Sequence, residues 1–210
     1  MSFPDQRIDT IILAGGRGDR MGGQDKGWVD FGTSTFIEAT LAAFADTPVR
    51  PLISVNRNLE RYRALALQHD GLVIQDLEPD FRGPLGGLVA AVSELQSDWV
   101  FVVPCDTPLL SPLFARRLLA AAQDKPSADG FVASDGQRIQ PLHCLLKRSA
   151  LQQLPAFMAV PRERPPGMMG WTSQCDVREV DFSDSGAMFA NINTPQMLDK
   201  VRAAGRRFQD

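Results

Sequence analysis

The chain has 210 residues, of which 44% are hydrophobic and 22% are charged, and its formal net charge is −3. This length favours a single domain whose core needs neither disulfides nor a structural metal. The 22 basic residues are balanced by 25 acidic ones, so charge gives no reason to expect a nucleic-acid partner. These numbers indicate an ordinary globular protein.

Membrane and disulfide-dependent classes are also disfavoured. No apolar run approaches the roughly 20 residues that cross a bilayer, and the opening MSFPDQRIDT lacks the features of a secretory signal. The three cysteines, Cys105, Cys144 and Cys175, are widely spaced and form no CxxC pair, so we expect neither a disulfide framework nor a zinc site. The sequence predicts a soluble, cytoplasmic protein without a membrane partner.

Short apolar runs alternate with amphipathic segments over the first 125 residues. Taken in chain order, the predicted elements are a strand at 8–14, a helix at 35–45, a strand at 51–55, a helix at 59–67, a strand at 72–75, a helix at 85–95, a strand at 99–103 and a helix at 112–123. Apolar strands separated by helices indicate a mostly parallel sheet that is covered on both faces. The expected fold is therefore a doubly wound, Rossmann-like α/β/α sandwich.

The pattern is looser after residue 125. The predicted elements are strands at 129–133 and 139–146, a long irregular segment at 155–175, a strand-like run at 189–193 and a helix at 195–206. A long irregular segment in a compact domain is either functional or mobile, or else a surface excursion without consequence.

A glycine-rich loop after the first strand is the most informative segment. Residues 13–27 read LAGGRGDRMGGQDKG, with five glycines between positions 15 and 23. Glycine allows close backbone approach to a ligand, and successive N–H groups can surround an anion. Because Arg17, Arg20 and Lys26 add three cations to this loop, we expect it to bind a polyphosphate.

The spacing excludes two common phosphate loops. A Walker A motif requires Ser or Thr after its lysine, whereas Gly27 follows Lys26. A dinucleotide fingerprint that starts at Gly16 would need a third glycine where Met21 stands. The remaining alternative is a loop that only turns the chain. The three cations at the carboxyl end of a strand, where α/β sheets bind ligands, argue against it.

Residues 13–27 resemble the LAGGxxxRMGGxDKG signature of the molybdenum cofactor guanylyltransferases, the MobA family of nucleotidyltransferases. The resemblance extends along nearly the whole chain through SVNR at 54–57, QD at 75–76, FRGPLGG at 81–87, PCDTP at 104–108 and NINTP at 191–195. It implies one nucleotidyltransferase domain, 1–210, in which about 8–125 binds the nucleotide and about 126–210 forms the second-substrate region.

The resemblance implies transfer of GMP from GTP to the terminal phosphate of molybdopterin, with release of pyrophosphate. It assigns catalysis to Arg17, Arg20, Lys26 and Asp106, with Mg²⁺ held by Asp106 as the cofactor. A carboxylate at this sheet edge suits Mg²⁺, although an aspartate followed by Thr and Pro also suits a turn or a helix cap. The product would pass to an insertion chaperone or an apo-molybdoenzyme.

The same resemblance points to a larger set of binding residues. The nucleotide set is Leu13, Ala14, Gly15, Gly16, Lys26, Ser54, Asn56, Asp76 and Asp106, and the second-substrate set is Gly83, Asn191 and Asn193. The Asp76 carboxylate can accept two hydrogen bonds from guanine, or contact the ribose. Whether Ser54 or Asn56 faces the base is open, because Asn56 also suits a turn. Asn191 and Asn193 would point the same way on a strand.

Two other readings compete with this one. Related cytidylyl- and sugar-phosphate nucleotidyltransferases resemble LAAGxGxRM, with alanine where this chain has Gly15. A nucleotide-binding regulator without chemistry is disfavoured by the presence of both Lys26 and Asp106.

Other polar and aromatic residues fall outside these motifs. His69 and His143 are isolated, and we expect structural roles for them. The Met168, Met169 and Trp171 cluster could contact a pterin or form an ordinary hydrophobic lid.

Overall fold

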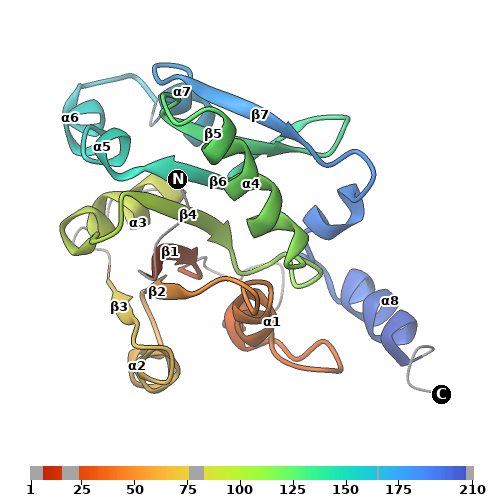
Figure 1. The fold of residues 1–210 in the computed structure, drawn as a ribbon. Helices are drawn as coiled ribbons and strands as arrows, with labels where there is room; N and C mark the ends of the chain where they lie inside the picture. Colours follow the sequence, from red (N-terminus) through yellow and green to blue (C-terminus); the bar gives the residue numbers. More distant parts are fainter. Residues whose placement is uncertain (1–6, 16–23, 76–82, 165, 207–210) are drawn as a thin grey trace.

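The computed structural model describes residues 7–15, 24–75, 83–164 and 166–206. Within them, seven strands form one sheet in the order β3-β2-β1-β4-β6-β5-β7 (Figure 1). The strands are β1 (Ile8–Leu13), β2 (Val49–Ser54), β3 (Leu72–Ile74), β4 (Trp99–Pro104), β5 (Gly130–Ser134), β6 (Ile139–Lys147) and β7 (Val177–Asp181). All six predicted strands between residues 8 and 146 are present.

The sheet is mostly parallel, as expected. β1 pairs in parallel with β2 and β4, and β3 continues this arrangement on β2. β6 is antiparallel to both β4 and β5, while β7 is parallel to β5. The carboxyl ends of β1, β2, β3, β4 and β5 therefore meet at one edge of the sheet, which is where α/β sheets bind ligands.

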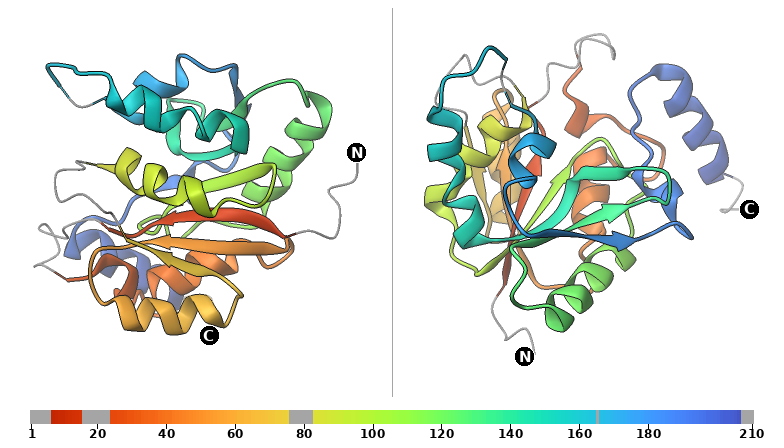
Figure 2. Two further views of the ribbon diagram at one scale, coloured as in Figure 1. Left: turned by 90° about the vertical axis from the view of Figure 1, so that its left-hand side faces the viewer. Right: turned by 90° about the horizontal axis from the view of Figure 1, so that it is seen from above.

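Helices cover both faces of the sheet (Figure 2). One face carries α1 (Phe36–Ala42), α2 (Leu59–Leu67) and α4 (Leu113–Asp124), and the other carries α3 (Pro84–Ala91), α5 (Arg148–Leu151), α6 (Leu154–Ala159) and α7 (Met168–Thr172). This arrangement confirms the predicted α/β/α sandwich.

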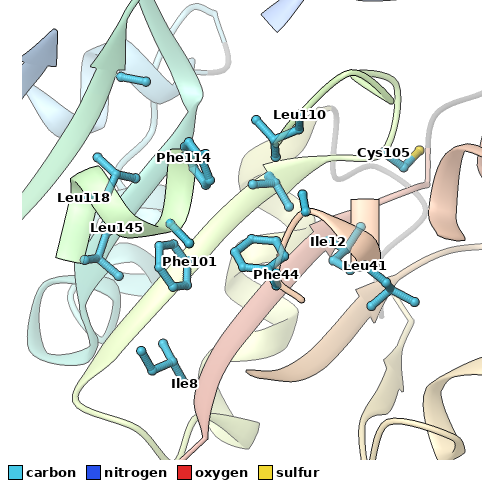
Figure 3. Packing of buried hydrophobic residues seen from close by; sticks show 14 of the residues in the cluster. Ile8, Ile12, Leu41, Phe44, Phe101, Cys105, Leu110, Phe114, Leu118 and Leu145 are labelled. Carbon is cyan, nitrogen blue, oxygen red and sulfur yellow. The ribbon is translucent and has the colours of Figure 1, made fainter. Parts of the chain in front are cut away.

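Strand residues alternate between two hydrophobic cores. Ile12 and Phe101 face α1 and α4, whereas Ile11 and Val102 face α3. Figure 3 shows the first core, where the ring of Phe101 lies 5.1 Å from that of Phe44 and 5.9 Å from that of Phe114. Burying each such side chain contributes roughly 1.5–3 kcal/mol. The sheet is thus a firm support for the residues at its edge.

A third, smaller core attaches the last helix, α8 (Pro195–Arg206). Ile192 and Leu198 pack against Val29 and Phe36, which lie at the end of the 3-10 turn η2 (Lys26–Trp28) and at the start of α1. This contact brings the segment before α8 next to Lys26.

The structure corrects two predictions in the last third of the chain and adds one strand that was not predicted. The run 189–193 is not a strand: its first residue, Phe189, ends the 3-10 turn η4 (Gly186–Phe189), and the run is not part of the sheet. The segment 155–175 is not wholly irregular, since it contains most of α6 and all of α7. β7 was not predicted: it is an edge strand of sequence VREVD with largely exposed side chains, so no apolar run marks it.

Candidate active site

The ends of the central strands are level at the carboxyl edge. Leu13 is in register with both Ser54 and Pro104. The ladder then continues one residue further, since the Ala14 N–H donates to the Ser54 carbonyl at 2.9 Å and the Cys105 N–H donates to the Leu13 carbonyl at 3.1 Å. The glycine-rich loop therefore leaves the middle of this edge, with the residues that follow β2 and β4 on either side.

Lys26 joins three distant segments at this edge. Its Nζ donates to Asp106 Oδ2 at 3.1 Å and to Asn193 Oδ1 at 2.6 Å. The Lys26 and Asp106 side chains are 20% and 18% exposed, so the pair is partly buried yet reachable by a ligand. The structure thus brings together one cation, one carboxylate and one amide that the motifs singled out separately.

The segment before α8 is hydrogen-bonded directly to the backbone of Asp106, the acidic member of this ion pair. The Ile192 N–H donates to the Asp106 carbonyl at 2.9 Å, and the Ile192 side chain is buried. Asn191 and Asn193, on either side of Ile192, are less buried than it is. They were predicted to lie on a strand, but the structure places no strand here. Asn193 reaches Lys26, whereas Asn191 is exposed.

Ser54 and Asn56 differ in accessibility. Ser54 is 3% exposed, and a Cβ on Gly87 in α3 would lie only 2.4 Å from its Oγ. Asn56 is exposed, and a Cβ on Gly15 would lie 3.5 Å from its Nδ2. The Asn56 side chain is therefore the one beside the glycine-rich loop, while Ser54 packs against the first turn of α3.

Gly83 lies just before α3 with a φ of +101°, a backbone conformation that favours glycine. Pro84 then opens the helix, where its missing N–H costs nothing. Gly83, which the resemblance assigned to the second substrate, therefore also has a backbone conformation that would be strained in a residue with a side chain.

Residues 10–170 match the family model for the MobA-like NTP transferase domain. The chain belongs to this family. A relative from Vibrio cholerae, named molybdenum cofactor guanylyltransferase, is 38% identical over 200 residues, which cover 94% of each chain. A relative of the same name from Shewanella amazonensis is 39% identical over 199 residues, covering 94% of this chain and 97% of the relative.

Solved structures share the fold at lower identity. The molybdopterin-guanine dinucleotide biosynthesis protein A from Archaeoglobus fulgidus has a TM-score of 0.71 and 20% identity, covering 95% of this chain and 100% of that one. The 2-C-methyl-D-erythritol 4-phosphate cytidylyltransferase from Thermus thermophilus has a TM-score of 0.68 and 18% identity, covering 96% and 100%. Because proteins named for different activities share this fold, the fold alone does not identify the nucleotide.

Some of the site residues predicted from the sequence lie outside the described residues. These are Gly16, Arg17, Arg20 and Asp76. Their roles remain predictions from the resemblance.

Two buried residues beside Asp106 are unsuited to proton transfer or nucleophilic attack. Burial, with a smaller contribution from Asp106, raises the pKa of the Cys105 thiol. Burial lowers the pKa of His143 to about 3, and its Nε2 lies 3.0 Å from Thr107 Oγ1. A neutral His143 therefore supports the turn that carries Asp106, in agreement with a structural role.

Other potential ligands are placed as follows. Cys105, Cys144 and Cys175 are all free thiols. Among the described residues, no group of three or more His, Cys, Asp or Glu side chains could hold a metal ion. No helix in the described part of the chain has the length and hydrophobicity to span a bilayer.

The Met168 and Trp171 side chains do not line the site. Both are buried in the core beneath α7, and only Met169 is largely exposed. Because α7 is helical, Met168 and Trp171 point into the core while Met169 points to solvent. The sequence did not show this difference, since the segment was expected to be irregular.

The sequence did not reveal the residues that hydrogen-bond to Asp25, the residue immediately before Lys26. Asp25 Oδ1 accepts a hydrogen bond from the Tyr62 hydroxyl at 2.6 Å, and Asp25 Oδ2 accepts one from Asn58 Nδ2 at 2.8 Å. Asp25 lies inside the family signature, but no pattern in the sequence indicated a partner for it. Tyr62 is the only tyrosine of the chain, and this was the one signal available in the sequence; its full burial is seen only in the structure.

Proposed function

We propose that this member of the MobA-like NTP transferase domain family transfers GMP from GTP to the terminal phosphate of molybdopterin. The products would be pyrophosphate and the guanine dinucleotide form of the cofactor. The observation that carries the proposal is the contact of Lys26 with Asp106 and Asn193 at the carboxyl edge of the sheet. The proposal is also supported by relatives at 38% and 39% identity, which are named molybdenum cofactor guanylyltransferases.

In this proposal the part of the chain at about 8–125 binds GTP. Leu13, Ala14 and Gly15 lead from β1 into the glycine-rich loop, and Gly16 continues it. The exposed Asn56, beside Gly15, is better placed than the buried Ser54 to reach the base. Ser54 would act by seating α3 against the end of β2.

Asp76 is the proposed guanine reader. Its carboxylate would accept hydrogen bonds from the base, and loss of such a contact leaves a buried polar group unpaired, which discriminates strongly between bases. We expect Asp76→Asn to weaken GTP binding by roughly tenfold, because the amide oxygen keeps one of the two hydrogen bonds while the amide NH₂ group faces the other guanine donor and cannot accept from it. Calorimetry with GTP checks this expectation. Unchanged affinity would remove Asp76 from the site.

The chemistry needs alignment and charge neutralisation more than a general base. A terminal phosphate oxygen of molybdopterin is already anionic, and it forms a bond to the α-phosphorus of GTP as the bond to the pyrophosphate oxygen breaks. Lys26, with Arg17 and Arg20, would stabilise the negative charge that gathers on the pyrophosphate. The chain's cations would thus favour the transition state over bound GTP.

Asp106 is the proposed ligand of Mg²⁺. Within the described part of the chain, its carboxylate receives a hydrogen bond only from Lys26, and only on Oδ2. Its other oxygen fits a cation that takes few protein ligands and fills its remaining positions with water and phosphate oxygens. When bound, Mg²⁺ would offset the charge of the α-phosphate and of the leaving group.

The part at about 126–210 is proposed to bind molybdopterin, together with Gly83. Asn193 contacts Lys26, so a substrate phosphate held by Asn191 and Asn193 would lie next to the leaving-group cation. We further propose that the reaction takes place in the cytoplasm. Its product would pass to an insertion chaperone or an apo-molybdoenzyme.

The test is calorimetric titration with GTP, CTP, UTP and ATP, each with and without Mg²⁺, followed by turnover with molybdopterin. We expect binding of GTP alone, strengthened by the metal, and release of one pyrophosphate per dinucleotide formed. A preference for CTP would instead favour the hypothesis that the protein is a cytidylyltransferase. GTP binding without any turnover would favour a nucleotide-binding regulator.

The metal assignment makes its own prediction. Asp106→Asn should leave metal-free GTP binding within a few-fold, abolish the gain from Mg²⁺ and lower turnover roughly 100-fold, or about 2.7 kcal/mol. The change keeps the side-chain shape but removes its charge. Asp98→Asn is the matched control, since Asp98 pairs with Arg148 away from this edge. Retained Mg²⁺ dependence in Asp106→Asn would refute the assignment.

A further inference from the structure

The turn that carries Lys26 is hydrogen-bonded to helix α2 through Asp25. The fully buried Tyr62 donates its hydroxyl hydrogen to Asp25 Oδ1 at 2.6 Å, and the Asp25 side chain is only 7% exposed. Asp25 is the residue immediately before η2, and Tyr62 lies in the middle of α2. The two hydrogen-bonded residues thus connect the turn to an element packed on the sheet.

The Asp25 carboxylate also caps the turn itself. Its Oδ1 accepts a hydrogen bond from the Gly27 N–H at 3.3 Å, which occupies a donor that the turn leaves unpaired. Its Oδ2 accepts one from Asn58 Nδ2 at 2.8 Å, and Arg57 Nε lies 4.0 Å from the same oxygen. One carboxylate therefore fixes both the turn and the start of α2.

Gly27 is the residue that allows this close approach. A Cβ at position 27 would lie 2.2 Å from Tyr62 Oη and 3.1 Å from Tyr62 Cζ. Its φ is not in the left-handed region, so space rather than backbone conformation explains the glycine here. The hydroxyl of Tyr62 fills the space that the missing side chain leaves.

Lys26 stands between these two fixed residues. Its neighbours on both sides, Asp25 and Gly27, contact Tyr62, while its Nζ reaches Asp106 and Asn193. A lysine side chain loses up to about 2 kcal/mol of rotamer entropy when it is held in one geometry. Fixing its backbone beforehand reduces what remains to be ordered when substrate binds.

We infer that Tyr62 and Asp25 are positioning residues, which hold the Lys26 ammonium where the leaving pyrophosphate develops its charge. The inference rests on the proposed function for the identity of the leaving group. It makes Gly27 a residue required for packing against Tyr62 as well as part of a phosphate loop. Tyr62 stays a neutral donor throughout, because burial and the hydrogen bond to Asp25 raise its pKa.

The first test is Tyr62→Phe, which keeps the ring that lies 5.0 Å from the ring of Trp28 and removes only the hydroxyl. We expect kcat to fall about tenfold while KM for GTP changes less than threefold. The matched control is Thr40→Val, which removes another fully buried hydroxyl, one that donates to the Phe36 carbonyl within α1. It should lower the melting temperature by a similar amount and leave kcat unchanged.

A rescue experiment separates positioning from general destabilisation. Gly27→Ala should lower kcat about 100-fold, because its methyl group displaces the turn from the Tyr62 hydroxyl. Combining it with Tyr62→Phe removes the 2.2 Å clash, so the double variant should be more active than Gly27→Ala alone. Losses that simply multiply would contradict a shared geometry.

A measurement without substrate keeps the inference testable if the wild type makes no dinucleotide. NMR of the Lys26 ¹³Cε and ¹⁵Nζ groups should show a restricted ammonium in the wild type and in Thr40→Val. Tyr62→Phe should show conformational averaging of the same signals. Unchanged Lys26 signals in Tyr62→Phe would overturn the inference. A wild type without turnover would instead count against the proposed function alone.

Discussion

Replacing Lys26 by methionine should lower turnover about 10²–10³-fold and leave the fold intact. Lysine and methionine have similar length, so the change removes chiefly the ammonium that contacts Asp106 and Asn193. Removing one preorganised group that stabilises transition-state charge typically costs this much. The stability effect should stay within about 1 kcal/mol, since the ion pair is partly exposed and such pairs contribute little. Pyrophosphate release and urea unfolding measure the two quantities.

Two companion variants make this result specific to Lys26. Lys147→Met removes a lysine at the end of β6, where its Nζ lies 5.5 Å from the centre of the Trp99 ring, and should keep full activity. Lys26→Arg keeps the charge but presents it in a planar group of different reach, so an intermediate rate is expected. If Lys26→Met turns over within threefold of the wild type, the role assigned to this residue is wrong.

The largest pH effect on stability should come from His143. Burial lowers its pKa from 6.5 to about 3 in the folded protein. Between these values the unfolded chain binds a proton that the folded chain does not, so stability falls as the pH falls. The loss approaches about 1.4 kcal/mol per pH unit and reaches about 3 kcal/mol at pH 4. Above pH 6.5 the contribution of His143 is fully retained.

Urea unfolding at pH 7, 6, 5 and 4 tests this expectation with His143→Gln. Glutamine does not titrate and can still bond to Thr107, which His143 contacts at 3.0 Å. The variant should be the less stable protein at pH 7, yet lose about 3 kcal/mol less than the wild type on going to pH 4. His69→Gln serves as the control, because His69 is exposed. Parallel pH curves for His143→Gln and the wild type would assign the acid sensitivity to other groups.

The fold was largely predictable because burial on both faces of a parallel sheet leaves a strong apolar pattern. Helices 59–67 and 195–206 match the structure at both ends. The apolar pattern fails to predict strands where burial and strand pairing do not occur in the same residues. Residues 189–193 resemble a short strand because Phe189 and Ile192 are apolar and buried, yet no ladder pairs them. β7 shows the converse, since it pairs with β5 while its side chains stay largely exposed.

The site was predictable only as a set of separate motifs. Lys26, Asp106 and Asn193 belong to three motifs, and their meeting depends on how β1, β4 and α8 pack. The contact between Gly27 and Tyr62 is harder still to foresee, because a glycine beside a lysine in a phosphate loop is normally attributed to the ligand. Here its neighbour is a hydroxyl 35 positions further along the chain.

The hydrogen bond between Lys26 and Asn193 spans 167 positions of the chain. Chains fold from the N-terminus while the ribosome is still adding residues, so the strands up to β4 can pack before Asn193 has been synthesised. A nascent chain then carries Lys26 and Asp106 without the Asn193 amide, which accepts a hydrogen bond from Lys26 in the folded protein. The three-residue contact of Lys26, Asp106 and Asn193 can therefore assemble only near the end of translation, when the strands up to β4 have had time to pack.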